Sequence, residues 1–138
     1  MPPRAHHVGL TVSDLDRAVA FYRDVLGLAV VDRFSVDGEA FATGVGVDGA
    51  SAEFAHLDAD GVRIELVAYD PEGAAVESGT VNRPGTAHVG LSTPDLDAFY
   101  ESLPAEVETQ SAPQRTASGT KILFVRDPEG NLVEVLEA

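Results

Sequence analysis

The chain has 138 residues, no cysteine and a formal net charge of -14. Its length suits one compact domain, or two half-size modules that share a core. The absence of cysteine excludes disulfide bonds, thiolate metal sites and cysteine nucleophiles. Because phosphate contacts need clustered Lys and Arg, the acidic balance argues against a nucleic-acid partner. With neither a bilayer-length apolar stretch nor the apolar core of a secretory signal, we expect a cytoplasmic protein without a membrane partner.

The first half of the chain predicts a strand, a helix and three further strands. Apolar residues alternate with other residues over 5–12, which is typical of a half-buried strand. Ser13 and Gly27 are predicted to cap and to end the helix that follows. Its apolar residues recur at helical spacing: Leu15, Val19, Tyr22 and Leu26. Three strands are predicted at 28–35, 52–58 and 62–69, with a loop over 36–51 and a hairpin turn at Asp60-Gly61.

The second half repeats this layout. Residues 88–97 read HVGLSTPDLD and match HVGLTVSDLD at 7–16 in seven of ten positions. DPEGNLVEV at 127–135 echoes DADGVRIEL at 58–66, so the order of the two repeated motifs is the same in both halves. Thr93, followed by Pro94, is predicted to cap the second helix. Strands are predicted at 106–109, 121–127 and 132–137, with a loop over 110–119.

One His and one Glu recur in each half, away from the apolar face of their strands. Alternation places the side chain of His7 on the other face of its strand from Val8. It likewise places Glu65 on the other face from its apolar neighbours Ile64 and Leu66. The repeat puts a second such pair at His88 and Glu134. A His or Glu on a strand is more often merely solvated or hydrogen-bonded, but both halves keep the same two residues while their surroundings have drifted. Imidazole and carboxylate ligands suit one divalent ion, such as Ni, Co, Mn, Fe or Zn.

Four stretches of the sequence carry a resemblance to a known family. They are HVGLTVSDLDRAVAFYRDVLGL at 7–28, IELVAY at 64–69, HVGLSTPDLDAFYESL at 88–103 and FVRDPEGNLVEVLE at 124–137. Together they resemble the vicinal oxygen chelate superfamily, which includes glyoxalase I. The resemblance implies an α+β fold in which one domain, 1–138, contains two βαβββ modules, 5–69 and 86–137, whose curved mixed sheets form an open barrel around one metal. It implies the ligands His7, Glu65, His88 and Glu134.

This resemblance also implies a reaction. A glutamate at position 65 completes a four-ligand set of glyoxalase type, whereas dioxygenases and fosfomycin-modifying enzymes of the family leave that position empty. A metal-dependent lyase or isomerase is therefore implied, which abstracts a proton from a small carbonyl substrate and stabilises an enediolate with the metal. Glu134 is the expected base, and Glu65 is the second candidate. Two alternatives stay open: a non-catalytic protein that binds an antibiotic or metabolite, and a metal-dependent dioxygenase.

Four further residues are candidates for substrate binding: Thr11, His56, Arg63 and Tyr69. Arg63 shares a strand face with Glu65 and is expected either to meet an anionic substrate or to form a salt bridge at the rim. His56 is expected to line the cleft, or to be partly buried without a function. Thr11 and Tyr69 stand where glutathione-using glyoxalase I enzymes usually carry Arg and Asn. Family members of this length often form homodimers, so we expect a homodimer whose modules pair within one chain or across two.

Overall fold

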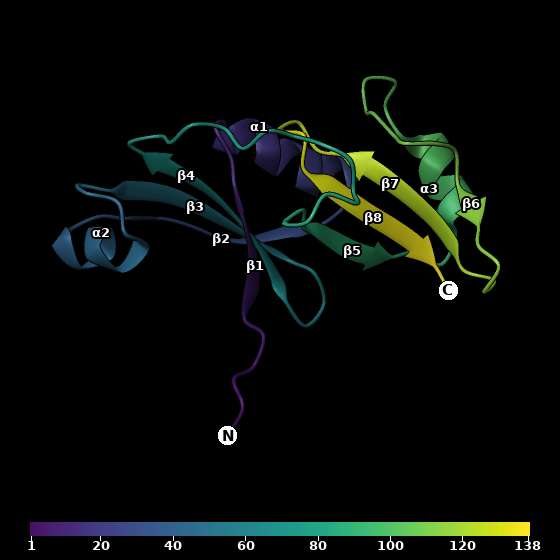
Figure 1. Cartoon of the computed structure of the whole chain (residues 1–138). Helices are drawn as coiled ribbons and strands as arrows, with labels where there is room; N and C mark the ends of the chain where they lie inside the picture. Colours follow the sequence, from purple (N-terminus) through teal and green to yellow (C-terminus); the bar gives the residue numbers. More distant parts are fainter. The chain divides into compact units, whose positions relative to one another are not determined.

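The computed structural model describes all 138 residues, and the chain divides into two compact units, Met1–Ala75 and Val76–Ala138. Each unit contains a four-stranded mixed sheet together with short helical segments (Figure 1). The predicted α+β class is therefore confirmed. None of the helices is long and apolar enough to cross a membrane.

The first unit is built around a sheet with the strand order β1-β4-β3-β2. Its elements are β1 (His7–Thr11), α1 (Leu15–Ala20), η1 (Phe21–Val25), β2 (Ala29–Val36), α2 (Glu39–Val45), β3 (Ser51–Asp58) and β4 (Arg63–Asp70). β1 runs parallel to β4, and the other neighbouring strands are antiparallel. Helix α1 packs against β3 and β4, so one part of the core lies between this helix and one face of the sheet. The opposite face carries a second buried cluster, Ala52, Phe54 and Val67, against which Phe41 of α2 packs.

The first helix differs from its prediction in two respects. Asp14, not Ser13, is the N-cap, because its carboxylate accepts the backbone N–H of Arg17 at 3.0 Å. After Ala20 the helix widens into the π-helical turn η1, in which Leu26 N–H donates to the Phe21 carbonyl. Gly27, at φ +77°, ends the segment as predicted.

The second unit repeats the arrangement with the strand order β5-β8-β7-β6. Its elements are β5 (His88–Ser92), α3 (Leu96–Ser102), β6 (Gln114–Arg115), β7 (Lys121–Arg126) and β8 (Leu132–Glu137). The strand predicted at 106–109 is wrong, because Val107 N–H closes a turn onto the Pro104 carbonyl and only Thr109 bridges to β7. The fourth strand is instead β6, inside a stretch that was predicted to be a loop.

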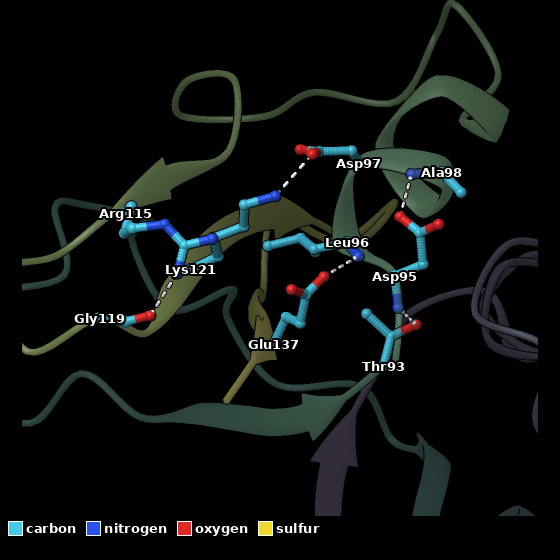
Figure 2. Close-up of polar contacts among 9 residues, drawn as sticks. All are labelled: Thr93, Asp95, Leu96, Asp97, Ala98, Arg115, Gly119, Lys121 and Glu137. Atoms are coloured by element: carbon cyan, nitrogen blue, oxygen red, sulfur yellow. Dashed lines mark hydrogen bonds and ion pairs between the residues drawn. The ribbon is translucent and has the colours of Figure 1, made fainter.

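The last strand anchors helix α3 to its own sheet (Figure 2). Asp95, not the predicted Thr93, is the N-cap, and its carboxylate accepts the Ala98 N–H at 3.0 Å. The Leu96 N–H, also in the first turn, donates to Oε1 of Glu137 on β8 at 2.9 Å. The ammonium of Lys121 on β7 binds the carboxylate of Asp97. Two strands therefore provide polar partners for the first turn of the helix.

Candidate metal-binding site

The first unit brings His7 and Glu65 together on one face of its sheet. Gly9 of β1 lies opposite Glu65 of β4, which puts His7 one diagonal step from the carboxylate on the same face. His7 Nε2 lies 3.5 Å from Glu65 Oε2. The flanking Ile64 and Leu66 are buried on the other face, as the alternation predicted. Strand register alone therefore produces this pair.

The second unit builds the same pair from His88 and Glu134. Gly90 of β5 lies opposite Glu134 of β8, and His88 Nε2 is 3.5 Å from Glu134 Oε1. The exposed fractions also match: 38% and 37% for the two His side chains, and 13% and 19% for the two Glu side chains. The duplication has therefore preserved the geometry of the pair as well as the residue types.

Gly9 keeps space open beside the first pair. A Cβ at Gly9 would lie 3.7 Å from Oε1 of Glu65 and 3.9 Å from the His7 ring, so a side chain would occupy the space next to both groups. A Cβ at the equivalent Gly90 would meet nothing within 4 Å. In both units the position opposite the carboxylate thus leaves room for a bound species.

The chemistry of the two pairs fits a divalent metal. Two ligand atoms with bonds of about 2.1 Å to one ion lie roughly 3–3.5 Å apart, and the His–Glu separation in each unit falls in this range. No group of three or more His, Cys, Asp or Glu side chains is arranged to hold a metal ion. Each unit therefore presents a pair of candidate ligands.

His56 adds a contact in the first unit that the sequence did not predict. Its side chain is only 6% exposed, and its Nε2 lies 2.7 Å from Glu65 Oε2. Arg63 Nη1 lies 3.2 Å from the Nδ1 atom of the same ring. His56 and Arg63, both candidates for substrate binding, thus contact each other, and His56 contacts a candidate ligand. His56 lies directly opposite Glu65 in the observed register of β3 and β4, and alternation along the two strands does not specify that register.

The two other substrate-binding candidates lie apart from these contacts. Thr11 is exposed at the end of β1. Tyr69 is half-buried and stacks on Phe41 of α2, with ring centroids 6.3 Å apart. Phe41 in turn contacts Phe54, and Phe54 stacks on Phe34 at 4.9 Å. The edge of the His56 ring meets Phe34 at 5.2 Å, so an aromatic row extends from α2 to the Glu65 carboxylate.

Comparison with known proteins connects this chain to one superfamily. The family model described as Glyoxalase/Bleomycin resistance protein/Dioxygenase superfamily matches residues 4–135. Lactoylglutathione lyase of Haemophilus influenzae is 33% identical over 95% of this chain and 90% of its own length. Virulence protein STM3117 of Salmonella typhimurium is 31% identical over 96% and 82%, respectively. Lactoylglutathione lyase GLX1 of Arabidopsis thaliana is 27% identical, and the match spans 43% of its length.

The solved structures show the same fold. A glyoxalase family protein from Bacillus cereus superposes with a TM-score of 0.87 at 25% identity, over 99% of this chain and 95% of the other. Glyoxalase I of Leishmania major superposes with a TM-score of 0.66 at 22% identity, over 99% and 87%. The similarity to the Leishmania major structure supports the fold alone.

Proposed function

Because the chain belongs to the Glyoxalase/Bleomycin resistance protein/Dioxygenase superfamily, we propose that it is a divalent-metal-dependent lyase or isomerase of glyoxalase type. The observation that carries the proposal is the His–Glu pair that each unit presents with the same 3.5 Å separation. The Haemophilus influenzae relative, which is named a lactoylglutathione lyase, supports this reaction class. The substrate is a small carbonyl compound.

The four paired residues are the proposed ligands of one divalent ion: His7, Glu65, His88 and Glu134. An imidazole and carboxylate set of this kind accepts Ni, Co, Mn, Fe or Zn. When bound, the ion acts as a Lewis acid that polarises a substrate carbonyl and makes the neighbouring C–H more acidic. The contribution of the chain is to hold the ligands in place and to move the proton.

Glu134 is the proposed base. On an α-hydroxy carbonyl substrate, its carboxylate would take the proton from the hydroxyl-bearing carbon and return it to the former carbonyl carbon. The hydroxyl proton would pass to the former carbonyl oxygen, so the substrate isomerises without any net gain or loss of atoms. Phe124 lies opposite Glu134 on β7 and offers it no hydrogen-bond donor. In the first unit the residue opposite Glu65 is His56, whose ring binds that carboxylate. The less restrained carboxylate is the better candidate for a group that exchanges a proton.

The two positions that distinguish glutathione-using relatives favour a substrate without glutathione. Thr11 and Tyr69 replace the Arg and Asn expected there, and neither provides a cation for a peptide carboxylate. Tyr69 instead stacks on Phe41 in the aromatic row. We therefore propose a small carbonyl compound that is recognised mainly at its reacting end.

Metal titration followed by a substrate screen tests this proposal. Chelator-treated protein is titrated with Ni, Co, Mn, Fe and Zn by calorimetry, and the loaded protein is then assayed with 2-oxoaldehyde thiol adducts, acyl-CoA epimers and hydroxy-ketones. One equivalent of metal and isomerisation of one substrate class are expected. A protein that binds none of these ions would overturn the metal-dependent function and favour a sequestering role. Oxygen consumption with Fe(II) would instead identify a dioxygenase.

A further inference from the structure

His56 is a buried polar side chain in a largely aromatic setting. It is 5% exposed overall, and its ring contacts Phe34 edge-on at 5.2 Å. Burying an imidazole is unfavourable unless its nitrogen atoms find hydrogen-bond partners. Both ring nitrogens of His56 have one: Nε2 contacts Glu65, and Nδ1 contacts Arg63. The burial of this ring is therefore compensated by two specific side chains.

The identity of the partners fixes the direction of these hydrogen bonds. A guanidinium has only donors, so the Arg63 Nη1–H donates and His56 Nδ1 accepts. The ring proton then resides on Nε2 and is donated to Oε2 of Glu65 over 2.7 Å. The three residues form a line of donors that starts at an exposed guanidinium and ends on the candidate metal ligand.

The second unit has no equivalent of this line. Phe124 occupies the register position of His56, since it pairs with Glu134 as His56 pairs with Glu65. Its ring makes an edge contact with His88 at 5.2 Å and carries no hydrogen-bonding atom. The two candidate carboxylates are therefore equivalent in exposure and in distance to their own His, but different in their cross-strand neighbour.

We propose that His56, supported by Arg63, is a positioning residue that holds Glu65 as a permanent metal ligand and so assigns proton transfer to Glu134. This inference rests on the proposed function. The hydrogen bond is made to Oε2, the same oxygen that lies 3.5 Å from His7 Nε2, and so it fixes the orientation of the carboxylate beside the other candidate ligand of this unit. Residues that orient a ligand in this way typically change metal affinity by about 10- to 100-fold when they are replaced.

The alternative is that His56 only fills space, and the structure provides the variant that separates the two roles. A phenylalanine fits this position sterically, because the second unit carries one at the same register and the surrounding row is aromatic. His56→Phe therefore keeps the packing and removes the hydrogen bond. His56→Gln restores a donor to Glu65 and serves as the rescue variant. Phe34→Leu is the matched control, since it alters the same aromatic row and leaves the hydrogen bond between His56 and Glu65 in place.

The test measures metal affinity and the visible spectrum of the Co(II)-loaded protein, with thermal unfolding of the metal-free protein alongside. His56→Phe is expected to weaken binding by about 10- to 100-fold and to shift the Co(II) bands. His56→Gln should recover part of the affinity, and Phe34→Leu should match the wild type in both. Wild-type affinity and spectrum in His56→Phe would overturn the positioning role.

The same titration separates failure of this inference from failure of the proposed function. A wild-type protein that binds no divalent ion overturns the metal-dependent function and the inference with it. A wild-type protein that binds one ion, together with a His56→Phe variant that binds it equally well, overturns the inference alone. If every variant, including Phe34→Leu, loses affinity in step with its thermal stability, the effect is one of packing, and the inference is again overturned.

Discussion

His56 and Phe124 occupy the same register position in the two units, each directly across from a candidate metal-ligating glutamate, Glu65 or Glu134. The strand pairing around them is the same, and so are the separations within the two His–Glu pairs. The difference between an imidazole and a phenyl ring is therefore one chemical distinction between the two pairs; the other is a contact of His6 Nδ1 with His7 Nδ1 at 2.8 Å, for which Ala87 offers no counterpart beside His88. The difference between the two rings provides a physical basis for giving two otherwise equivalent carboxylates different tasks.

Placing a donor beside Glu134 should slow the reaction. Phe124→His copies the first unit into the second, so the new Nε2–H can bind the Glu134 carboxylate and restrict it as a base. We expect kcat to fall by at least about tenfold, with metal affinity close to that of the wild type. Steady-state kinetics at saturating metal measure the first quantity, and calorimetry measures the second. An unchanged kcat would count against Glu134 as the mobile base.

Neutralising the two glutamates should have different effects. Glu134→Gln keeps an oxygen for the metal but cannot accept the proton, so a loss of kcat of about 10²- to 10⁴-fold is expected with much of the metal retained. Glu65→Gln should mainly weaken metal binding and keep more turnover once metal is saturating. Comparing kcat and metal affinity of the two variants shows which glutamate acts as the base and which acts mainly as a metal ligand. Full activity in Glu134→Gln would refute its assignment as the base.

A bound metal should stabilise the fold through both units. An ion held only by the folded state raises the free energy of unfolding by about 2.7 kcal/mol at 100 times its Kd. Because the two His residues have equivalent positions, His7→Ala and His88→Ala should reduce this stabilisation by similar amounts. Urea denaturation with and without metal measures it. A loss confined to one variant would show that only one pair binds the ion.

Removing the acceptor on β8 should destabilise the second unit without affecting metal binding. Glu137→Ala leaves the Leu96 N–H of α3 without its carboxylate partner, and we expect a loss of about 1 kcal/mol in the free energy of unfolding. Asp95→Ala removes the other acceptor of the same helix turn and should cost a similar amount. Urea denaturation gives both values. A change in metal affinity in either variant would contradict the separation of this contact from the candidate site.

The ion pair between Lys121 and Asp97 should contribute to stability only below strongly alkaline pH. The hydrogen bond to Asp97 raises the pKa of Lys121 above its usual value of 10.5. A raised pKa in the folded state means that the stabilisation is fully present below 10.5 and is lost as the pH rises through the folded-state pKa. The difference in urea midpoint between wild type and Lys121→Met should therefore be larger at neutral pH than in solution alkaline enough to deprotonate Lys121 in the folded state. High salt should also reduce it, because Asp97 is exposed.

Most of the fold and the two His–Glu pairs could be predicted from the sequence, because both depend on short-range periodicity. Alternation along β4 and β8 fixes which face carries Glu65 and Glu134, and the repeated motifs indicate that the second unit copies the arrangement of the first. The contact between His56 and Glu65 depends on the register of the β3–β4 hairpin. Alternation alone does not specify that register, so the sequence suggested only that His56 lines a cleft.

The elements that were missed depend on tertiary packing. The segment of α2 reads EAFATGV, which has weak helix propensity and was predicted as loop. Its Phe41 packs against Phe54 and Tyr69, and these contacts stabilise a helix that the local sequence does not favour. The N-caps at Asp14 and Asp95 lie one and two residues beyond the predicted caps. Several neighbouring polar residues can cap a helix, and the sequence alone does not decide which of them does so.

The aromatic row that joins α2 to Glu65 makes this short helix a distant packing support for the buried His56 ring. A substitution at Phe41 changes the support of Phe54, which stacks on Phe34, and Phe34 in turn borders His56. Through these ring contacts the surface helix helps to keep the His56 ring out of water, while the hydrogen bond to Glu65 and every proposed ligand stay intact. The second repeat has no counterpart of α2, so this packing support exists on one side of the duplication only.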